Sequence, residues 1–210
     1  MYFKIHEDQK ELKEVLKKIA QLLHKDKVWA IPTETFYALA CNPFSEKALE
    51  RLFTLKGRSF DKPILLLLGR LEDLSLVVSR VPYLALKLMK VFWPGPLTLV
   101  LPAKRNLPKL LTANKENIGV RLSSCEITRK IAQYFGKPIT GTSANLSNEP
   151  PCKSAEEIKN TFPQIDFILD GGPVKSEAPS TVVEIIEKEV KLIREGAIPY
   201  KEILKIIRGE

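Results

Sequence analysis

The sequence predicts a mixed α/β (α+β) domain of three layers, in which helices flank a twisted, mostly mixed β-sheet. Two observations support this class. Amphipathic helical segments alternate with short apolar runs along the whole chain, and no repeat, low-complexity tract or linker interrupts them. A chain of 210 residues buries a sizeable core without disulfides. We therefore expect a single domain over residues 1–210.

The helices are recognised by their apolar periodicity and by their end signals. Between residues 7 and 25, apolar side chains recur at the helical period of 3.6 residues. Ser45 caps a helix that ends at Gly57. Ser154 and Glu157 form a capping box, and Pro199 begins the closing helix. Further helical segments are expected at residues 72–78, at 83–92 and up to 136.

The strands are recognised as short apolar runs, many of them rich in β-branched residues. The first run ends at Pro32, which lacks the N–H group that a central ladder needs. The expected strands are residues 28–31, 63–68, 97–101, 118–122, 167–169, 181–186 and 190–194.

Several classes of enzyme are excluded because the necessary residues are missing. The two histidines, His6 and His24, lie in or beside the first helical segment, away from every glycine-rich or proline-rich turn. This placement excludes a Ser-His-Asp triad and a histidine-bound zinc. Neither a Walker A nor a G-x-G-x-x-G sequence occurs, so a nucleotide site has to be built in another way.

The cellular compartment is indicated by the cysteines and by the apolar runs. Cys41, Cys125 and Cys152 are odd in number and show no C-x-x-C spacing, which argues against a disulfide framework or a thiolate zinc site. No apolar run approaches the roughly 20 residues that cross a bilayer, and the N-terminus lacks a secretory signal. We expect a cytoplasmic protein without a membrane segment. Its net charge of +8 suits an anionic partner such as a nucleotide or RNA.

Four segments have residues that suit neither a helix nor a strand, and such segments often lie at functional sites. They are residues 32–37, 56–58, 141–147 and 179–183. The third offers hydroxyls, an amide and backbone N–H groups, as phosphate-binding loops do. It also fits a capped turn with Ser143 or Asn145 as the N-cap, and the segment alone does not decide between the two.

Three basic residues are candidates for binding anions. Lys56 and Arg58 stand one residue apart, a spacing that suits a polyphosphate, although a single K-x-R is a weak signal. Arg121 lies in an apolar strand, where its charge needs an anion or a carboxylate as a partner. An internal salt bridge satisfies that need as well as a ligand does.

Taken in order, these segments resemble the YrdC-like family of L-threonylcarbamoyladenylate synthases. Each motif is short, but eight of them occur in the order and at the spacing of the family, over most of the chain. The motifs are P-T-E-T-x-Y at 32–37, K-x-R at 56–58, W-P-G-P-L-T at 93–98, G-V-R at 119–121, T-S-A-N-x-S at 142–147, D-G-G at 170–172, S-T-V-V at 180–183 and R-x-G-A-I at 194–198.

The resemblance implies a YrdC/RibB-like fold and a nucleotidyltransferase activity. Such enzymes form threonylcarbamoyl-AMP and pyrophosphate from L-threonine, bicarbonate or CO2 and ATP, for the N6-threonylcarbamoyladenosine (t6A) modification of tRNA. It implies Mg2+ held mainly by the ATP phosphates, with no metal site built by the protein. It also implies a tRNA-modifying transferase as the partner that receives the intermediate, and it allows direct contact with tRNA or other double-stranded RNA.

The resemblance assigns roles to nine residues. The expected catalytic residues, which surround the nucleotide phosphates, are Lys56, Arg58, Ser143 and Asn145. The expected ATP-binding residues are these four together with Thr142 and Arg194. The expected threonine-binding residues are Thr33, Arg121 and Ser180, with Arg121 pairing with the threonine carboxylate.

The sequence departs from the family pattern at three positions. Ser59 stands where proline is usual, Leu67 lies near a position that often holds histidine, and Asn148 stands where glycine is common. The C-terminal accessory domain of longer members is not expected. The alternative function is a non-catalytic double-stranded RNA-binding or ribosome-maturation protein of the same fold. Arg121 and Ser180 have no evident use in recognising RNA by shape, so the synthase is preferred.

Overall fold

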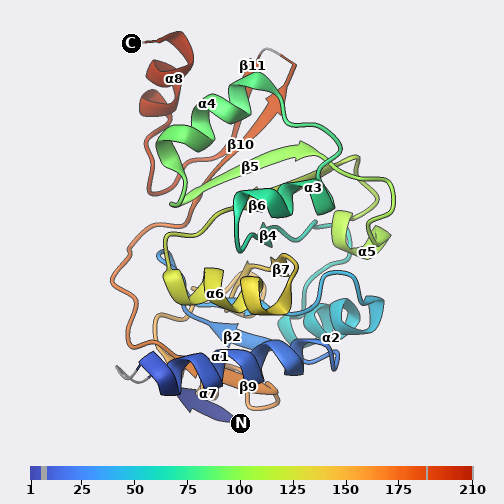
Figure 1. Ribbon diagram of the computed structural model, residues 1–210, viewed down its shortest axis with the longest axis vertical. Coiled ribbons are helices and arrows are strands. Elements are labelled where there is room, and N and C mark those ends of the chain that lie inside the picture. Colours follow the sequence, from blue (N-terminus) through green and yellow to red (C-terminus); the bar gives the residue numbers. More distant parts are fainter. Residues whose placement is uncertain (6–8, 188, 210) are drawn as a thin grey trace.

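A computed structural model describes residues 1–5, 9–187 and 189–209 of the chain. It confirms the mixed α/β class, with helices packed around mixed sheets along the long axis of the molecule (Figure 1). Residues 7 and 8, the expected start of the first helix, and the adjacent His6 lie outside the described residues. The helices are α1 (Gln9–Leu23), α2 (Glu46–Lys56), α3 (Leu74–Val77), α4 (Tyr83–Phe92), α5 (Lys109–Thr112), α6 (Glu126–Phe135), α7 (Ala155–Thr161) and α8 (Tyr200–Arg208), with a 3₁₀ turn at Leu71–Asp73.

The described strands form two sheets. Sheet A has the order β1-β9-β2-β3-β8, and sheet B has the order β11-β10-β5-β6-β4-β7. The strands of sheet A are β1 (Tyr2–Lys4), β2 (Trp29–Ile31), β3 (Ala38–Ala40), β8 (Thr142–Ser143) and β9 (Phe167–Asp170). Those of sheet B are β4 (Leu66–Leu67), β5 (Leu97–Pro102), β6 (Asn117–Arg121), β7 (Ile139–Thr140), β10 (Thr181–Ile186) and β11 (Glu189–Arg194).

Both sheets mix parallel and antiparallel pairs. In sheet A, β9 runs parallel to β1 and β2, whereas β3 is antiparallel to β2 and to β8. In sheet B, β10 runs parallel to β5 and β4 runs parallel to β6, whereas β5 and β6 are antiparallel. The edge strands β11 and β7 are antiparallel to β10 and β4. Strands from distant parts of the sequence are thus brought side by side.

The chain crosses from sheet B to sheet A at Gly141, between β7 and β8. The N–H group of Gly141 donates to the carbonyl of Leu65 at 2.9 Å. A Cβ atom at this position would lie 2.5 Å from Cγ of Leu67, so only glycine fits without displacement. A single residue thus links the two sheets at this point.

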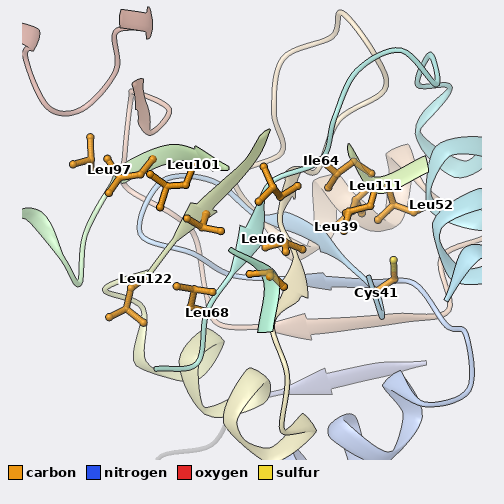
Figure 2. Close-up of a cluster of buried hydrophobic side chains, with 14 of the residues drawn as sticks. Leu39, Cys41, Leu52, Ile64, Leu66, Leu68, Leu97, Leu101, Leu111 and Leu122 are labelled. Atoms are coloured by element: carbon orange, nitrogen blue, oxygen red, sulfur yellow. The ribbon is translucent and has the colours of Figure 1, made fainter. Parts of the chain in front are cut away.

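The core joins the two sheets. One buried cluster contains Leu39 of β3, Leu66 of β4, Leu97 of β5 and Leu52 of α2, and Figure 2 shows it extending from Leu97 through Leu66 to Leu39 and Leu52. A second cluster lies where α1 and α6 cover the other face of sheet A, and it includes Trp29. Because both sheets contribute to one core, their spacing is fixed by packing.

The local signals identified most of the longer elements. The expected segments at 83–92 and 181–186 coincide with α4 and β10. The expected strand at 63–68 is shorter, since only Leu66–Leu67 pairs, and the segment at 72–78 divides into the 3₁₀ turn and α3. The short elements β1, β3, β7, β8 and α5 carried no periodic signal. No helix among the described residues is long and apolar enough to cross a membrane.

Candidate active site

A cavity of about 880 Å³ lies between the two sheets. Strands β5, β6 and β10 of sheet B line one side, and the turn from β2 to β3 together with β8 of sheet A lines the other. Its volume is typical of ligand sites. The residues expected from the sequence that line this cavity are Thr33, Arg58, Arg121, Thr142, Ser143, Asn145, Ser180 and Arg194. The ninth expected residue, Lys56, does not line it.

The loop at residues 143–145 is fixed by hydrogen bonds on both sides. The N–H group of Ala144 donates to the carbonyl of Tyr37 at 2.8 Å, and that of Cys152 donates to the carbonyl of Ala144 at 2.8 Å. The Ser143 hydroxyl lies 2.6 Å from Oδ1 of Asn145. This loop is therefore preorganised before any ligand binds.

Lys56 lies beneath this loop at the C-terminal end of α2, and its side chain is buried. Its ammonium donates to the carbonyl of Ser143, to the carbonyl of Asn145 at 2.9 Å and to Oδ1 of Asn145 at 2.8 Å. Burial and the nearby Arg58 charge lower the pKa of Lys56 to about 7. The ammonium thus supports the loop from behind.

Arg58 follows the left-handed cap Gly57 and extends along the cavity. Gly57 adopts φ of +59°, a conformation that glycine enters without a Cβ clash. The guanidinium donates to the carbonyl of Pro63 at 2.8 Å and to that of Lys62 at 3.2 Å. Burial lowers the pKa of Arg58, although a guanidinium remains charged at neutral pH.

Arg121 is the most deeply buried cation of the cavity, with 3% of its surface exposed. Its NH1 donates to the Thr35 hydroxyl at 3.2 Å, and its Nε lies 3.7 Å from Oε1 of Glu34. Burial lowers the pKa of Arg121, and the Glu34 charge opposes that shift. The sequence left open whether Arg121 pairs with a ligand or within the protein. The structure shows a carboxylate beside it and also places it on the cavity.

Ser180 and Arg194 meet at a bulge where β10 pairs with β11, and both line the cavity. The Arg194 guanidinium donates to the Ser180 carbonyl at 2.9 Å and to its hydroxyl at 3.2 Å. The Ser180 hydroxyl also lies 2.9 Å from the hydroxyl of Thr98 on β5. Burial and the nearby Arg121 charge lower the pKa of Arg194. Two arginines therefore share one end of the cavity.

The R-x-G-A-I motif is held in place by hydrogen bonds to the Thr181 hydroxyl. Its hydroxyl donates to the carbonyl of Ile198 at 2.6 Å and accepts from the N–H groups of Gly196 and Ile198, both at 3.0 Å. A Cβ on Gly196 would lie 2.2 Å from the carbonyl oxygen of Pro179. The motif thus holds Arg194 against the segment that carries Ser180.

The P-T-E-T-x-Y and D-G-G motifs also contact each other. The Thr33 hydroxyl donates to the carbonyl of Phe36 at 2.6 Å, which closes the turn after β2. The Tyr37 hydroxyl donates to the carbonyl of Gly172 at 2.8 Å and accepts from the N–H group of Gly171 at 3.0 Å. Thr33 is therefore held on the cavity wall by the backbone of its own turn.

Sequence reasoning missed a polar group at another part of the cavity. Asn117, Lys115 and Glu184 all line it, and Nδ2 of Asn117 donates to Oε1 of Glu184 at 2.8 Å. Thr35 and Thr98 were missed as well. Residues 98 and 184 lie in expected strands and residue 117 directly precedes one, so alternation could have identified polar side chains sharing one face of a sheet.

The three departures from the family pattern are accommodated locally. Leu67 is fully buried against Gly141 and does not line the cavity. Asn148 adopts φ of +74°, which asparagine tolerates better than most residues. Ser59 lies in the exposed turn after Arg58. These substitutions leave the cavity walls in place.

The described residues contain no group of three or more His, Cys, Asp or Glu side chains that could hold a metal ion. The carboxylates that line the cavity are Glu149, Glu177 and Glu184. This set does not form a protein cage for Mg2+, whereas an ion bound to phosphate oxygens needs few protein ligands.

Comparison with known proteins identifies the family. The model of the Sua5/YciO/YrdC family, described as "Telomere recombination", matches residues 21–196. The threonylcarbamoyl-AMP synthase of Pyrococcus abyssi is 37% identical over 189 residues, which are 90% of this chain and 56% of that protein. This chain therefore spans little more than half the length of that relative. The threonylcarbamoyl-AMP synthase of Buchnera aphidicola is 38% identical over 176 residues, which are 82% of this chain and 99% of that protein.

The solved structures agree with the sequence comparison. A crystal structure of P. abyssi Sua5 complexed with L-threonine superimposes with a TM-score of 0.91 at 33% identity. The match covers 99% of this chain and 60% of the other. The fold and most of this chain are thus shared with these proteins, and the chain belongs to the Sua5/YciO/YrdC family.

Proposed function

We propose that this protein is an L-threonylcarbamoyladenylate synthase, which makes threonylcarbamoyl-AMP and pyrophosphate from L-threonine, bicarbonate or CO2 and ATP. One observation carries the proposal. Arg58, Arg121 and Arg194 come from distant parts of the chain, yet they line a single cavity together with the loop at 143–145. Relatives that are named threonylcarbamoyl-AMP synthase match most of the chain.

Threonine binds at the end of the cavity that holds Arg121, Ser180 and Thr33. Arg121 is a buried cation, and burial strengthens its attraction for a carboxylate. A guanidinium recognises a carboxylate through paired N–H donors. The relative from P. abyssi was solved with L-threonine, which supports an amino acid as the ligand.

The ATP phosphates bind at a second group of cavity residues, formed by Arg58, Ser143 and Asn145. Thr142 lies beside this group, and Arg194 is a further nucleotide contact. Lys56 supports this group through the loop. Hydroxyls and backbone N–H groups on a rigid loop orient phosphate oxygens, and Arg58 offsets their charge. The two substrates are then held side by side in one cavity.

The reaction follows from this arrangement. The carbamate formed when the threonine amine takes up CO2 attacks the α-phosphorus of ATP, and pyrophosphate leaves. Positioning and charge stabilisation provide most of the acceleration in phosphoryl chemistry, so the absence of histidine from the cavity lining is no obstacle. Mg2+ bound to the ATP phosphates supplies further charge neutralisation when present.

The proposal includes a cytoplasmic location and a tRNA-modifying partner. The three cysteines are free, which suits the reducing cytoplasm. The product is an unstable acyl phosphate that a tRNA-modifying transferase would consume to form t6A, and the net charge of +8 suits an enzyme that works near tRNA. The alternative of a non-catalytic RNA-binding protein is disfavoured, because Arg121 is too deeply buried to contact a nucleic acid duplex.

Pyrophosphate release tests the proposed activity. Purified protein with ATP, Mg2+, bicarbonate and L-threonine should release pyrophosphate, and omission of threonine should abolish the release. Arg58→Ala should lower turnover by about two orders of magnitude, since one charge partner of the transition state is lost.

Arg51→Ala is the matched control for this variant. Arg51 lies on the exposed side of α2, where it pairs with Asp166 outside the cavity. Its removal should leave turnover unchanged. Release of pyrophosphate that does not depend on threonine would contradict the proposal, and wild-type turnover in Arg58→Ala would remove Arg58 from the site.

A further inference from the structure

Glu34 is a buried carboxylate of the P-T-E-T-x-Y motif that the reaction described above does not use. Its side chain is 14% exposed, and it does not line the cavity. Its Oε2 accepts a hydrogen bond from the Ser123 hydroxyl, and Ser123 in turn accepts from the N–H group of Cys125 at 3.1 Å. The carboxylate is therefore held in place from the side away from Arg121.

The other oxygen of Glu34 lies beside Arg121. Oε1 is 3.7 Å from Nε of Arg121, and neither atom has a hydrogen-bond partner among the described residues although both are buried. NH1 of Arg121 is used by the Thr35 hydroxyl. Nε thus faces a negative charge, and one terminal nitrogen is already engaged. NH2 is left for a ligand, because no partner for it is found within the described part of the chain.

We propose that Glu34 is a specificity-determining residue, which restricts the Arg121 end of the cavity to amino acids with a single carboxylate. This inference rests on the proposed function and names what selects its amino-acid substrate. L-Threonine brings one carboxylate and a neutral hydroxyl. An acidic side chain would add a second negative charge to an end of the cavity where Glu34 already offsets the charge of Arg121.

Glu34 also lowers the net charge of this end of the cavity. Arg121 and Arg194 lie close enough for the charge of one to lower the pKa of the other. In the protein without nucleotide, Arg194 has no phosphate partner, and without Glu34 the two guanidiniums would form an uncompensated pair of cations that suits a dicarboxylate. With Glu34 present, one carboxylate from the ligand is enough to balance the pair.

A binding experiment with the full chain tests the proposal. The affinities of L-threonine, L-asparagine and L-aspartate are measured by calorimetry, since asparagine and aspartate have nearly the same shape and differ by one charge. The wild-type protein should bind threonine, and it should bind aspartate at least tenfold more weakly than asparagine. In Glu34→Gln the ratio of the two affinities should shift by about tenfold in favour of aspartate.

Two further variants complete the experiment. Glu14→Gln removes the same charge from an exposed residue of α1 that is paired with Lys17 and does not line the cavity, so the ratio should stay as in the wild type. Glu34→Asp keeps the charge and should keep the discrimination, which provides a test if Glu34→Gln does not fold.

The outcomes separate this inference from the proposed function. Equal affinity of the wild-type protein for aspartate and asparagine would overturn the role of Glu34, as would an unchanged ratio in Glu34→Gln. In both cases threonine binding and pyrophosphate release would survive. A wild-type protein that does not bind threonine at all would overturn the inference together with the function on which it rests.

Discussion

The ammonium of Lys56 donates three hydrogen bonds to the loop at 143–145 while its side chain stays almost fully buried. A family resemblance places this residue at the nucleotide phosphates, but its side chain does not line the cavity. Its contribution to the site therefore passes through Ser143 and Asn145. Arg58, two residues later, contributes directly because it follows a left-handed turn and lies along the cavity.

The burial of Lys56 has consequences for stability as a function of pH. Its pKa is about 7 in the folded protein and 10.5 in the unfolded chain, so the folded protein binds fewer protons between these two values. The free energy of unfolding contributed by this residue therefore rises with pH from about 7 to 10.5. Lys56→Met should lose that rise, as measured by denaturant unfolding at pH 7 and pH 10.

Deprotonation of Lys56 should lower turnover, although it raises the contribution of this residue to the free energy of unfolding. A neutral amine has two N–H donors for three acceptors, so the loop is held less firmly above pH 7. Turnover of the wild-type protein should fall as pH rises above 7, and Lys56→Met should have low turnover with no such fall. Lys47→Met, an exposed lysine on the same helix, should behave as the wild type does. Parallel pH profiles for all three proteins would contradict this role of Lys56.

The short strands β7 and β8 determine the geometry of the site more than the long ones do. They are separated by Gly141, and they belong to different sheets. Their backbone places Ser143 opposite Ala38 of β3 and Thr140 opposite Leu66 of β4. Any side chain at Gly141 would push against Leu67 and Leu65.

Gly141→Ala should therefore destabilise the protein and disturb the site. The added methyl overlaps buried leucine atoms, and overpacking of this kind costs about 1–3 kcal/mol. Gly57→Ala is the comparison, since its Cβ meets no atom within 4 Å and only the positive φ is unfavourable, at about 1–2 kcal/mol. Thermal unfolding and pyrophosphate release measure both effects. A Gly141→Ala variant as stable as the wild type would contradict the crowding at Gly141.

The elements that the sequence could predict are those with local signals. Ser45 and Gly57 mark both ends of α2, and the Ser154 hydroxyl caps α7 as expected. By contrast, Ala38–Ala40 has little intrinsic preference for a strand, and Thr142–Ser143 lies inside a polar segment. These strands form because their partners in sheet A are adjacent after folding, and no local pattern in the sequence specifies that pairing.

The two sheets share one core and should unfold together. Trp29 lies in β2 of sheet A, and Trp93 precedes β5 of sheet B, with its indole donating to the carbonyl of Leu97 at 2.7 Å. Trp29→Phe and Trp93→Phe each leave one tryptophan, which reports on its own sheet. The fluorescence transitions of the two variants should each coincide with the loss of helical circular dichroism measured in the same variant. Separate transitions would show that the sheets are independent units.

The candidate site was predictable as a set of residues but not as an arrangement. The motif order selected Arg58, Arg121, Asn145 and Arg194 as candidates, and the structure brings all four to one cavity. That Lys56 lies behind the loop and that Glu34 lies beside Arg121 depend on contacts between segments more than 80 residues apart. Such contacts follow from the packing of the two sheets, and short motifs contain no information about that packing.

The position of the cavity between two sheets has a kinetic consequence. Arg121 and Ser180 belong to sheet B or its margin, whereas Ser143 and Asn145 belong to sheet A or the loop that follows it. In the proposed reaction, the distance between the carbamate and the α-phosphorus would therefore depend on how buried leucines such as Leu39 and Leu66 fill the interior between the sheets. Repacking these leucines, which do not line the cavity, should slow the chemical step and leave substrate affinity unchanged.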